Sequence, residues 1–277
     1  MLRYVICDLC EQNNTEIIQK AEAPFQIVRC KECDLVYVDP QPPRQFMSAH
    51  YNEDYYKEWI ETQMERRIPM WRKRLKRLSK YKKNGRLLDV GFGCGTFLKL
   101  AREKGFDVRG TEISEYACQY VKDKLGLDVF YGDLKKARFP AESFDVVTVW
   151  HTLEHLPSPS KTLEEIHRIL RKDGLLVVAV PNLNNFITRI LYFLARWKKL
   201  KFFSMKAKEL HLYHFSIPTL TAILEKTGFQ VKKIDLDLAQ IEPSKKIVDV
   251  FTRIVYFFSR RNFGEAMKAY AVKAGKR

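Results

Sequence analysis

Short apolar runs alternate with helical segments through the second two thirds of the chain. The strand-like runs lie at residues 87–90, 108–111, 129–131, 146–150 and 175–180. Helical spacing of apolar residues marks 96–104, 115–124 and 160–171 between them. A later helix at 218–227 is closed by Gly228 and precedes strand-like runs at 230–238 and 266–272. This alternation predicts an α/β fold, Rossmann-like and doubly wound, with a mostly parallel seven-stranded sheet.

The pattern changes before residue 85. Three prolines within residues 39–43 are incompatible with a helix or a central strand and predict a linker. Residues 46–83 have a helical composition, with Trp71, Leu75 and Leu78 at helical spacing under a strongly basic surface. We therefore expect a small module at 1–40, a basic helical cap at 41–84 and the main domain at 85–277. An amphipathic insertion is expected at about 183–217.

The formal net charge of +16 favours anionic partners, such as nucleic acid, anionic lipid or a nucleotide-linked molecule. Basic side chains that merely solvate helix faces would give the same number. The most apolar stretch, 186–203, is interrupted by five basic residues, so no transmembrane helix is expected. The first ten residues lack the apolar run of a secretory signal, which predicts a cytoplasmic protein.

Four of the six cysteines form two C-x-x-C pairs, Cys7 with Cys10 and Cys30 with Cys33, nineteen residues apart. This spacing is typical of a zinc ribbon, and the segment between the pairs is long enough for a hairpin. A closed shell of four thiolates would make the zinc structural. Disulfides, an iron–sulfur cluster and thiol redox chemistry are the alternatives.

A glycine-rich turn, Gly91-x-Gly93-x-Gly95, joins the first strand of the main domain to the helix after it. Glycines there let the backbone turn sharply and approach a ligand closely. A nicotinamide-binding G-x-G-x-x-G motif would need a third glycine at position 96, which is Thr96 here. The turn therefore predicts a nucleoside site of another kind.

Two carboxylates make this prediction more specific. Glu112 ends the second strand, where it could accept from both ribose hydroxyls, and Asp133 follows the third, where it could accept from an adenine amino group. With Asp89 ahead of the glycines, the pattern resembles the class I S-adenosylmethionine (SAM) dependent methyltransferases. The resemblance implies SAM as the cofactor. It also implies further cofactor contacts at the strand ends from Ile113, Leu134 and Trp150.

The resemblance extends towards the N-terminus. The run from Cys30-x-x-Cys33 to Pro42, followed by Tyr51-x-x-x-Tyr55-Tyr56, is similar to zinc-ribbon methyltransferases of sugar and surface-polysaccharide biosynthesis. That subset implies a small acceptor, either a saccharide or a lipid- or nucleotide-linked sugar. An RNA methyltransferase, in which the ribbon and basic helix grip phosphates, is one alternative. A catalytically silent SAM-binding interaction subunit is another.

Histidines follow the fourth strand, whose carboxyl end should border the ligand site. Methyl transfer to a hydroxyl usually needs a base, so His151 and His155 are candidates. The five residues from His151 to His155 also match the zinc-peptidase pattern H-x-x-E-H. That pattern requires a helix, whereas this run follows a strand and soon meets Pro157 and Pro159.

A second cluster, His211, Tyr213 and His214, precedes the helix at 218–227 and resembles a motif of the same subset. We expect it to bind the acceptor, with His214 as a third candidate base. The alternative is a helix entrance, with Ser216 as the N-cap and the aromatic residues in the core.

Two segments, 186–203 and 247–261, are predicted to be amphipathic helices that cover the acceptor site and touch an anionic membrane surface. The alternative is that both pack on the protein's own core. The expected partners are therefore a small-molecule or glycan acceptor and an anionic membrane at its cytoplasmic face, with nucleic acid less favoured.

Overall fold

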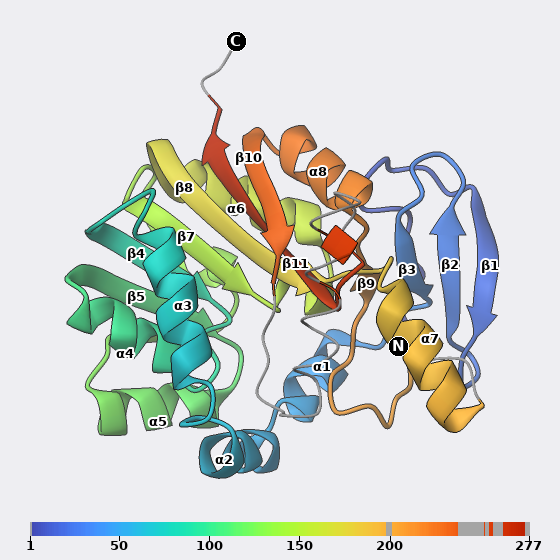
Figure 1. Ribbon diagram of the computed structural model, residues 1–277, viewed down its shortest axis with the longest axis horizontal. Helices are drawn as coiled ribbons and strands as arrows, with labels where there is room; N and C mark the ends of the chain where they lie inside the picture. Colours follow the sequence, from blue (N-terminus) through green and yellow to red (C-terminus); the bar gives the residue numbers. More distant parts are fainter. Residues whose placement is uncertain (1, 198–200, 238–251, 253–254, 257–262, 275–277) are drawn as a thin grey trace.

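The computed structural model describes residues 2–197, 201–237, 252, 255–256 and 263–274 (Figure 1). Its centre is a seven-stranded sheet in the order β10-β11-β8-β7-β4-β5-β6. The five strands from β4 to β8 run parallel, and β10 and β11 are antiparallel. The strands are β4 (Gly85–Val90), β5 (Phe106–Glu112), β6 (Val129–Tyr131), β7 (Phe144–Trp150), β8 (Leu170–Pro181), β10 (Phe229–Leu236) and β11 (Ala266–Lys273). The predicted Rossmann-like sheet is confirmed.

Helices cover both faces of this sheet (Figure 1). One face carries α3 (Ile68–Leu78), α4 (Thr96–Glu103) and α5 (Glu115–Leu125); the other carries α6 (Pro159–Ile169) and α8 (Ile217–Lys226). Successive strand residues point to opposite faces, so Leu87 packs in the α3–α4 core and Leu88 in the α6–α8 core. Burial on both faces explains why the strands read as continuous apolar runs.

The N-terminal residues form a second, antiparallel sheet in the order β1-β2-β3-β9. Its strands are β1 (Thr15–Lys20), β2 (Gln26–Cys30), β3 (Val36–Asp39) and β9 (Tyr213–His214). Since β9 comes from the middle of the main domain, this sheet is not separate from it. Tyr37 belongs to the same buried cluster as Phe215 and Leu220. Asp8 also binds the start of α6, accepting from the Ser160 N–H at 2.7 Å.

The chain between the two sheets is helical, in three pieces. They are α1 (Arg44–His50), α2 (Glu53–Thr62) and α3, with Asn52 capping α2 by accepting from the Tyr55 N–H. Figure 1 shows α1 and α2 beside the edge at which the parallel strands end. Within the described residues, no helix is both long enough and apolar enough to cross a membrane. The predicted amphipathic segment at 247–261 lies almost entirely outside those residues.

Candidate functional site

The glycine-rich turn after β4 has a left-handed backbone. Gly91, Gly93 and Gly95 have φ angles of 73°, 59° and 72°, which side-chain-bearing residues rarely adopt. A Cβ at Gly91 would come within 2.3 Å of the Thr152 hydroxyl, and one at Gly95 within 2.7 Å of Val121. A Cβ at Gly93 would meet nothing within 4 Å. Neighbouring side chains therefore enclose two of the glycines, while the middle one has open space beside it.

Asp89 lies beneath this turn and is 2% exposed. Its Oδ1 accepts from the Thr148 hydroxyl of β7 at 2.7 Å. Burial raises the pKa of Asp89 to about 8, although the Thr148 hydrogen bond opposes the shift. The sequence-based prediction made Asp89 a cofactor contact. Because the carboxyl is enclosed between two strands, the structure instead favours a supporting role under the turn.

Glu112, at the end of β5, is held by backbone donors. Its Oε2 accepts from the Gly93 N–H at 3.1 Å, and its Oε1 accepts from Ile113 at 2.7 Å and Ser114 at 3.3 Å. Burial raises the pKa of Glu112, whereas these donors and the Tyr56 hydroxyl favour the charged form. Tyr56 of α2 is 6% exposed, and its hydroxyl contacts the Glu112 carboxylate. The Tyr56 hydroxyl thus interacts with the carboxylate for which the sequence predicts contacts to ribose hydroxyls.

A cavity of about 430 Å³ opens between the start of α2 and the ends of β5 and β6. Tyr51, Ile113, Ser114 and Tyr131 are among its lining residues. Asp133 lies nearby, where it caps η1 (Leu134–Ala137) by accepting from the Lys136 N–H at 3.0 Å, and its side chain is 47% exposed. Leu134 is buried. Ile113 thus lines the cavity, whereas the other two expected cofactor contacts in this region, Asp133 and Leu134, are not among its lining residues.

Trp150 ends β7 in an aromatic cluster with Trp71 and Phe97. Its indole N–H is buried and meets no acceptor among the described residues. The Arg74 guanidinium of α3 contacts both tryptophans, 4.7 Å from the Trp71 ring and 4.8 Å from the Trp150 ring. Trp150 is therefore packed against α3 and α4, so a direct cofactor contact remains a prediction.

Arg74 also anchors a buried charge network. Its guanidinium pairs with Asp237, to which the Lys268 ammonium donates at 2.8 Å, and all three side chains are at most 4% exposed. Burial opposes ionisation of Asp237, but the two cations hold its pKa well below the usual range. This network links α3 to the antiparallel strands β10 and β11.

His151 joins the same network. Its Nε2 lies 3.1 Å from Arg74 Nη2 and 3.5 Å from Asp237 Oδ2, and its Nδ1 lies 3.7 Å from Glu154 Oε1. Burial opposes the charged ring, but the two carboxylates outweigh it and raise the pKa of His151 to about 9. The Arg74 guanidinium can only donate hydrogen bonds, so it favours a neutral His151 ring. Because Asp237 already neutralises the charge of Arg74, we assign a raised pKa to His151. Either way Nε2 is engaged, which disfavours the predicted role of His151 as the base.

His155 closes η2 (Leu153–His155) and is positioned from two other segments. Its Nδ1 lies 2.7 Å from the Leu210 carbonyl and 2.9 Å from the Tyr51 hydroxyl. A carbonyl only accepts, so Nδ1 carries the proton and Nε2 keeps a lone pair. Burial lowers the pKa of His155, which leaves the ring neutral near pH 7. Its ring centroid is 4.9 Å from that of His211.

The second predicted cluster divides into two parts. Tyr213 is 2% exposed, its ring packs with those of Tyr37 and Phe215, and its hydroxyl donates to the Pro157 carbonyl. Tyr213 therefore packs in the core, and its predicted role in substrate binding stays a prediction. Ser216 caps α8 by accepting from the Thr219 N–H, as the alternative interpretation proposed.

His214 pairs with Val36 in the N-terminal sheet and is 8% exposed. Burial lowers its pKa to about 3. Its Nε2 is buried and finds no hydrogen-bond partner among the described residues, so its predicted role in acceptor binding or as a base stays a prediction. His211 lies between His214 and His155, at a ring-centroid distance of 6.2 Å from His214.

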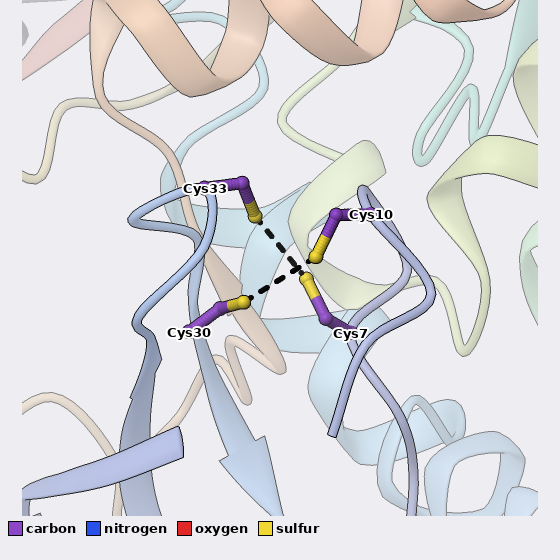
Figure 2. Close-up of side chains that lie close together, drawn as sticks. All are labelled: Cys7, Cys10, Cys30 and Cys33. Atoms are coloured by element: carbon purple, nitrogen blue, oxygen red, sulfur yellow. Dashed lines mark hydrogen bonds between the residues drawn. The ribbon is translucent and has the colours of Figure 1, made fainter. Parts of the chain in front are cut away.

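The four N-terminal cysteines converge at one point (Figure 2). The Cys7 and Cys33 sulfurs are 3.4 Å apart, as are those of Cys10 and Cys30, and none of the four is in a disulfide. All four sulfurs lie within 4.8 Å of one another. Zinc–sulfur bonds of about 2.3 Å in a tetrahedron separate sulfurs by roughly 3.8 Å, so the four thiols fit such an ion.

Comparison with known families now adds to this geometry. A family model described as a methyltransferase domain matches residues 60–234, more than half of the chain. The chain belongs to this methyltransferase family. The parallel sheet, the glycine turn and the acidic strand ends are those of a class I SAM-dependent methyltransferase. The matched range begins before β4 and ends within β10, and it includes the histidines after β7.

Relatives of this methyltransferase match over part of their length. A probable SAM-dependent methyltransferase from Mycolicibacterium smegmatis is 28% identical over 147 residues, 53% of this chain and 52% of the relative. A ubiquinone biosynthesis O-methyltransferase from Paraburkholderia phymatum is 35% identical over 107 residues, 36% of this chain and 45% of the relative. The chain thus spans about half the length of these relatives.

Solved structures share the fold of this methyltransferase. A complex between the Haloferax volcanii Trm112 methyltransferase activator and a methyltransferase contains a chain with a TM-score of 0.57 and 20% identity. The match covers 81% of this chain and 98% of that one. A SAM-dependent methyltransferase from Thermotoga maritima has a TM-score of 0.55 and 21% identity, covering 83% and 99%. At this identity the likeness concerns the fold alone.

Sequence reasoning missed several side chains that shape the methyltransferase site. The Tyr56 hydroxyl contacts Glu112, and the buried Arg74 and Asp237 hold His151. In the sequence, Glu154 stands out only as the acidic residue of the H-x-x-E-H pattern. In the structure its side chain is 1% exposed and lies beside two histidines. The Tyr51-x-x-x-Tyr55-Tyr56 run was the available signal for the tyrosines. For Arg74 and Asp237, 163 residues apart, the chain carried no local signal.

Proposed function

We propose that this methyltransferase transfers the SAM methyl group to a hydroxyl of a small polar acceptor, in the first place a saccharide or a lipid- or nucleotide-linked sugar. The observation that carries the proposal is the pairing of two features at one sheet edge. The glycine turn and Glu112 suit the adenosine part of SAM. The neutral histidines after β7 and before α8 suit a hydroxyl-bearing acceptor.

In this proposal the cofactor lies against the glycine turn and Glu112, and Ile113 lines its cavity. The Tyr56 hydroxyl would move away from Glu112 so that the ribose hydroxyls can take its place. Asp133 would accept from the adenine amino group. Bound SAM supplies an electrophilic methyl group on a sulfonium, and the protein's contribution is positioning and acceptor activation.

Among the three candidate histidines, His155 is the best placed to activate the acceptor. Its proton on Nδ1 is fixed by the Leu210 carbonyl, which leaves the Nε2 lone pair free to take a proton. His151 is engaged by Arg74 and Asp237, and the His214 ring is enclosed by the N-terminal sheet. We assign acceptor binding to His211; His214 would join it only if the acceptor displaced the groups that bury its Nε2.

Transfer of labelled methyl from SAM to a panel of nucleotide sugars, lipid-linked saccharides and RNA tests this function. We expect label in a saccharide, and His155→Gln should lower kcat by about 100-fold or more with SAM affinity retained. His167→Gln on α6 is the matched control and should keep its activity. Label in RNA alone would establish the alternative RNA methyltransferase, and SAM binding without any transfer would indicate a silent interaction subunit.

We also propose that the four cysteines hold one structural zinc ion. Zinc would link the loop of Cys7 and Cys10 to the turn between β2 and β3, with all four coordination positions filled by thiolates. Metal analysis should find about one zinc per chain, and Cys10→Ser should lower both the zinc content and the melting temperature. Cys118→Ser, outside the cluster, should keep its zinc. Purified protein with no zinc, or with disulfides among the four, would contradict the proposal.

An exposed apolar helix face suggests how the protein would reach a lipid-linked acceptor at a membrane surface. Helix α7 (Phe186–Arg196) leaves an apolar face open to solvent, with side chains between 43% and 79% exposed: Phe186, Ile190, Phe193, Leu194 and Trp197. We propose that this face, together with the basic surface, attaches the protein to an anionic bilayer and favours a lipid-linked acceptor. The relatives that act in ubiquinone biosynthesis are compatible with such an acceptor.

Sedimentation with liposomes tests the attachment. The protein should bind anionic vesicles at low salt, bind less at high salt, and lose binding in Ile190→Ser and Leu194→Ser. Ile17→Ser, an equally exposed residue of β1, is the control. Recovery of the protein in the supernatant under every condition would contradict the proposed membrane attachment. The face would then be open to a protein partner, as in the complex of a structural neighbour with an activator.

A further inference from the structure

Glu154 presents a buried carboxylate that the mechanism proposed above does not use. Its side chain is 1% exposed, and neither of its oxygens accepts a hydrogen bond from the part of the chain that the structure describes. The His151 Nδ1 lies 3.7 Å from Oε1, so the charged His151 ring forms an ion pair with Glu154 but donates no hydrogen bond to it. Burying an ion without donors is costly, so such a group calls for a partner.

Two imidazoles lie beside this carboxylate. One ligand atom each from Glu154, His155 and His211 falls within 4.8 Å of the other two. The His211 Nε2 is buried and makes no hydrogen bond to any described residue; the nearest carboxylate oxygen, on Glu209, is 3.6 Å away. The His155 Nε2 keeps its lone pair because Nδ1 donates to the Leu210 carbonyl. A carboxylate and two imidazoles therefore form one cluster in which hydrogen bonds leave the Glu154 oxygens and the His211 Nε2 unoccupied.

We propose that Glu154, His155 and His211 bind a divalent transition metal ion, at a site distinct from the four cysteines. Two histidines and one carboxylate form a ligand set that zinc, iron(II) and cobalt(II) accept with positions left open. The carbonyl that orients His155 is the outer-sphere partner that metal-binding histidines usually have. Donors 4.8 Å apart must come somewhat closer to share an ion, and the His211 ring can turn without losing a hydrogen bond.

The position of the ion gives it a use. Tyr51 lines the cavity near β5 and its hydroxyl lies 2.9 Å from the His155 Nδ1, so the ion would sit across Tyr51 from the cavity. An ion with open positions binds an acceptor hydroxyl and makes its proton easier to lose. His155 would then act as a ligand, and acceptor activation would pass to the metal. This use rests on the proposed function, whereas metal binding itself does not.

Cobalt(II) binding to the full chain tests the site. The protein is first treated with a mild chelator that leaves the cysteine zinc in place, and Co²⁺ is then titrated with calorimetry and absorption spectroscopy together. We expect one equivalent of Co²⁺ to bind without the thiolate-to-cobalt absorption that a cysteine site gives. Neither SAM nor acceptor is present, so the result is independent of the proposed reaction.

Glu154→Gln and His211→Asn should weaken Co²⁺ binding by at least tenfold, with unchanged zinc content and melting temperature as proof of folding. His167→Asn, which changes a histidine of α6 away from the cluster, should bind Co²⁺ as the natural chain does. Absence of Co²⁺ binding, binding that shows thiolate absorption only, or equal binding in both variants would overturn the site. The cluster would then be an ion-pair network of Glu154 with His151 and of His211 with Glu209.

Discussion

The two halves of the sheet's carboxyl edge are built in different ways. At β4 to β6 the site comes from residues 89–134, and its central carboxylate, Glu112, accepts from three backbone N–H groups of the adjacent turns. At β7 to β10 the site draws on Tyr51, Arg74, His211 and Asp237, which are far apart in the chain. There the described structure leaves buried atoms of Glu154, His211 and His214 without hydrogen bonds.

This difference is consistent with what we propose that each half binds. A cofactor shared by a whole family can be held by a short motif whose polar groups are arranged by local backbone. A specific acceptor needs groups from several segments, and those groups must stay unpaired until the acceptor or an ion arrives. The charge network of Arg74 therefore differs in its role from Glu112. It joins segments that are far apart in the chain, and the site at β7 to β10 is formed from those segments.

Arg74→Met should have the largest effect on stability. It leaves Asp237 buried with only Lys268 and His151 as partners and removes the cation that contacts Trp71 and Trp150, so we expect a loss of about 3 kcal/mol in urea unfolding. Arg168→Met, which breaks a partly exposed pair with Glu165, should cost at most about 1 kcal/mol. Equal losses in both variants would mean that the second half does not depend on this network.

Glu112→Ala probes the first half. Two hydrogen bonds from ribose hydroxyls to a carboxylate account for an expected drop in SAM affinity of about 100-fold by calorimetry. Glu103→Ala, at an exposed position of α4, should bind SAM normally. A variant that still melts cooperatively and binds SAM with full affinity would show that Glu112 serves only the backbone turn, and the contrast between the halves would disappear.

The sequence predicts more of the first half, which is built from neighbouring residues, than of the second half, which is built from distant segments. Strand β6 falls at the predicted residues, and the glycine turn lies where the spacing placed it, because both depend on neighbouring residues. The burial of Tyr213 could not be predicted, because it depends on the pairing of β9 with β3, from the other end of the chain. Arg74 and Asp237 could not be paired for the same reason: no local pattern encodes a contact between α3 and the end of β10.

The smallest expected effect concerns Asp89, which is buried beneath the glycine turn of the first half. Its pKa of about 8 in the folded protein exceeds its ordinary value of 3.8, so the folded state binds a proton that the unfolded chain releases. The stability from this proton is complete below about pH 4 and is lost as pH rises towards 8. Between pH 5 and 7.5 we expect the natural chain to lose about 1 to 3 kcal/mol relative to Asp89→Asn in urea unfolding.

Asp128→Asn, at an exposed carboxylate, is the control and should follow the natural chain at every pH. The same variants separate support from direct contact, because a neutral Asp89 beneath the turn has no charge to offer SAM. Asp89→Asn should therefore keep SAM affinity within about threefold, a change of less than 1 kcal/mol. If its stability difference is flat with pH while SAM affinity falls tenfold or more, Asp89 is ionised and touches the cofactor. The first half would then hold SAM through two carboxylates, with the glycine turn between them.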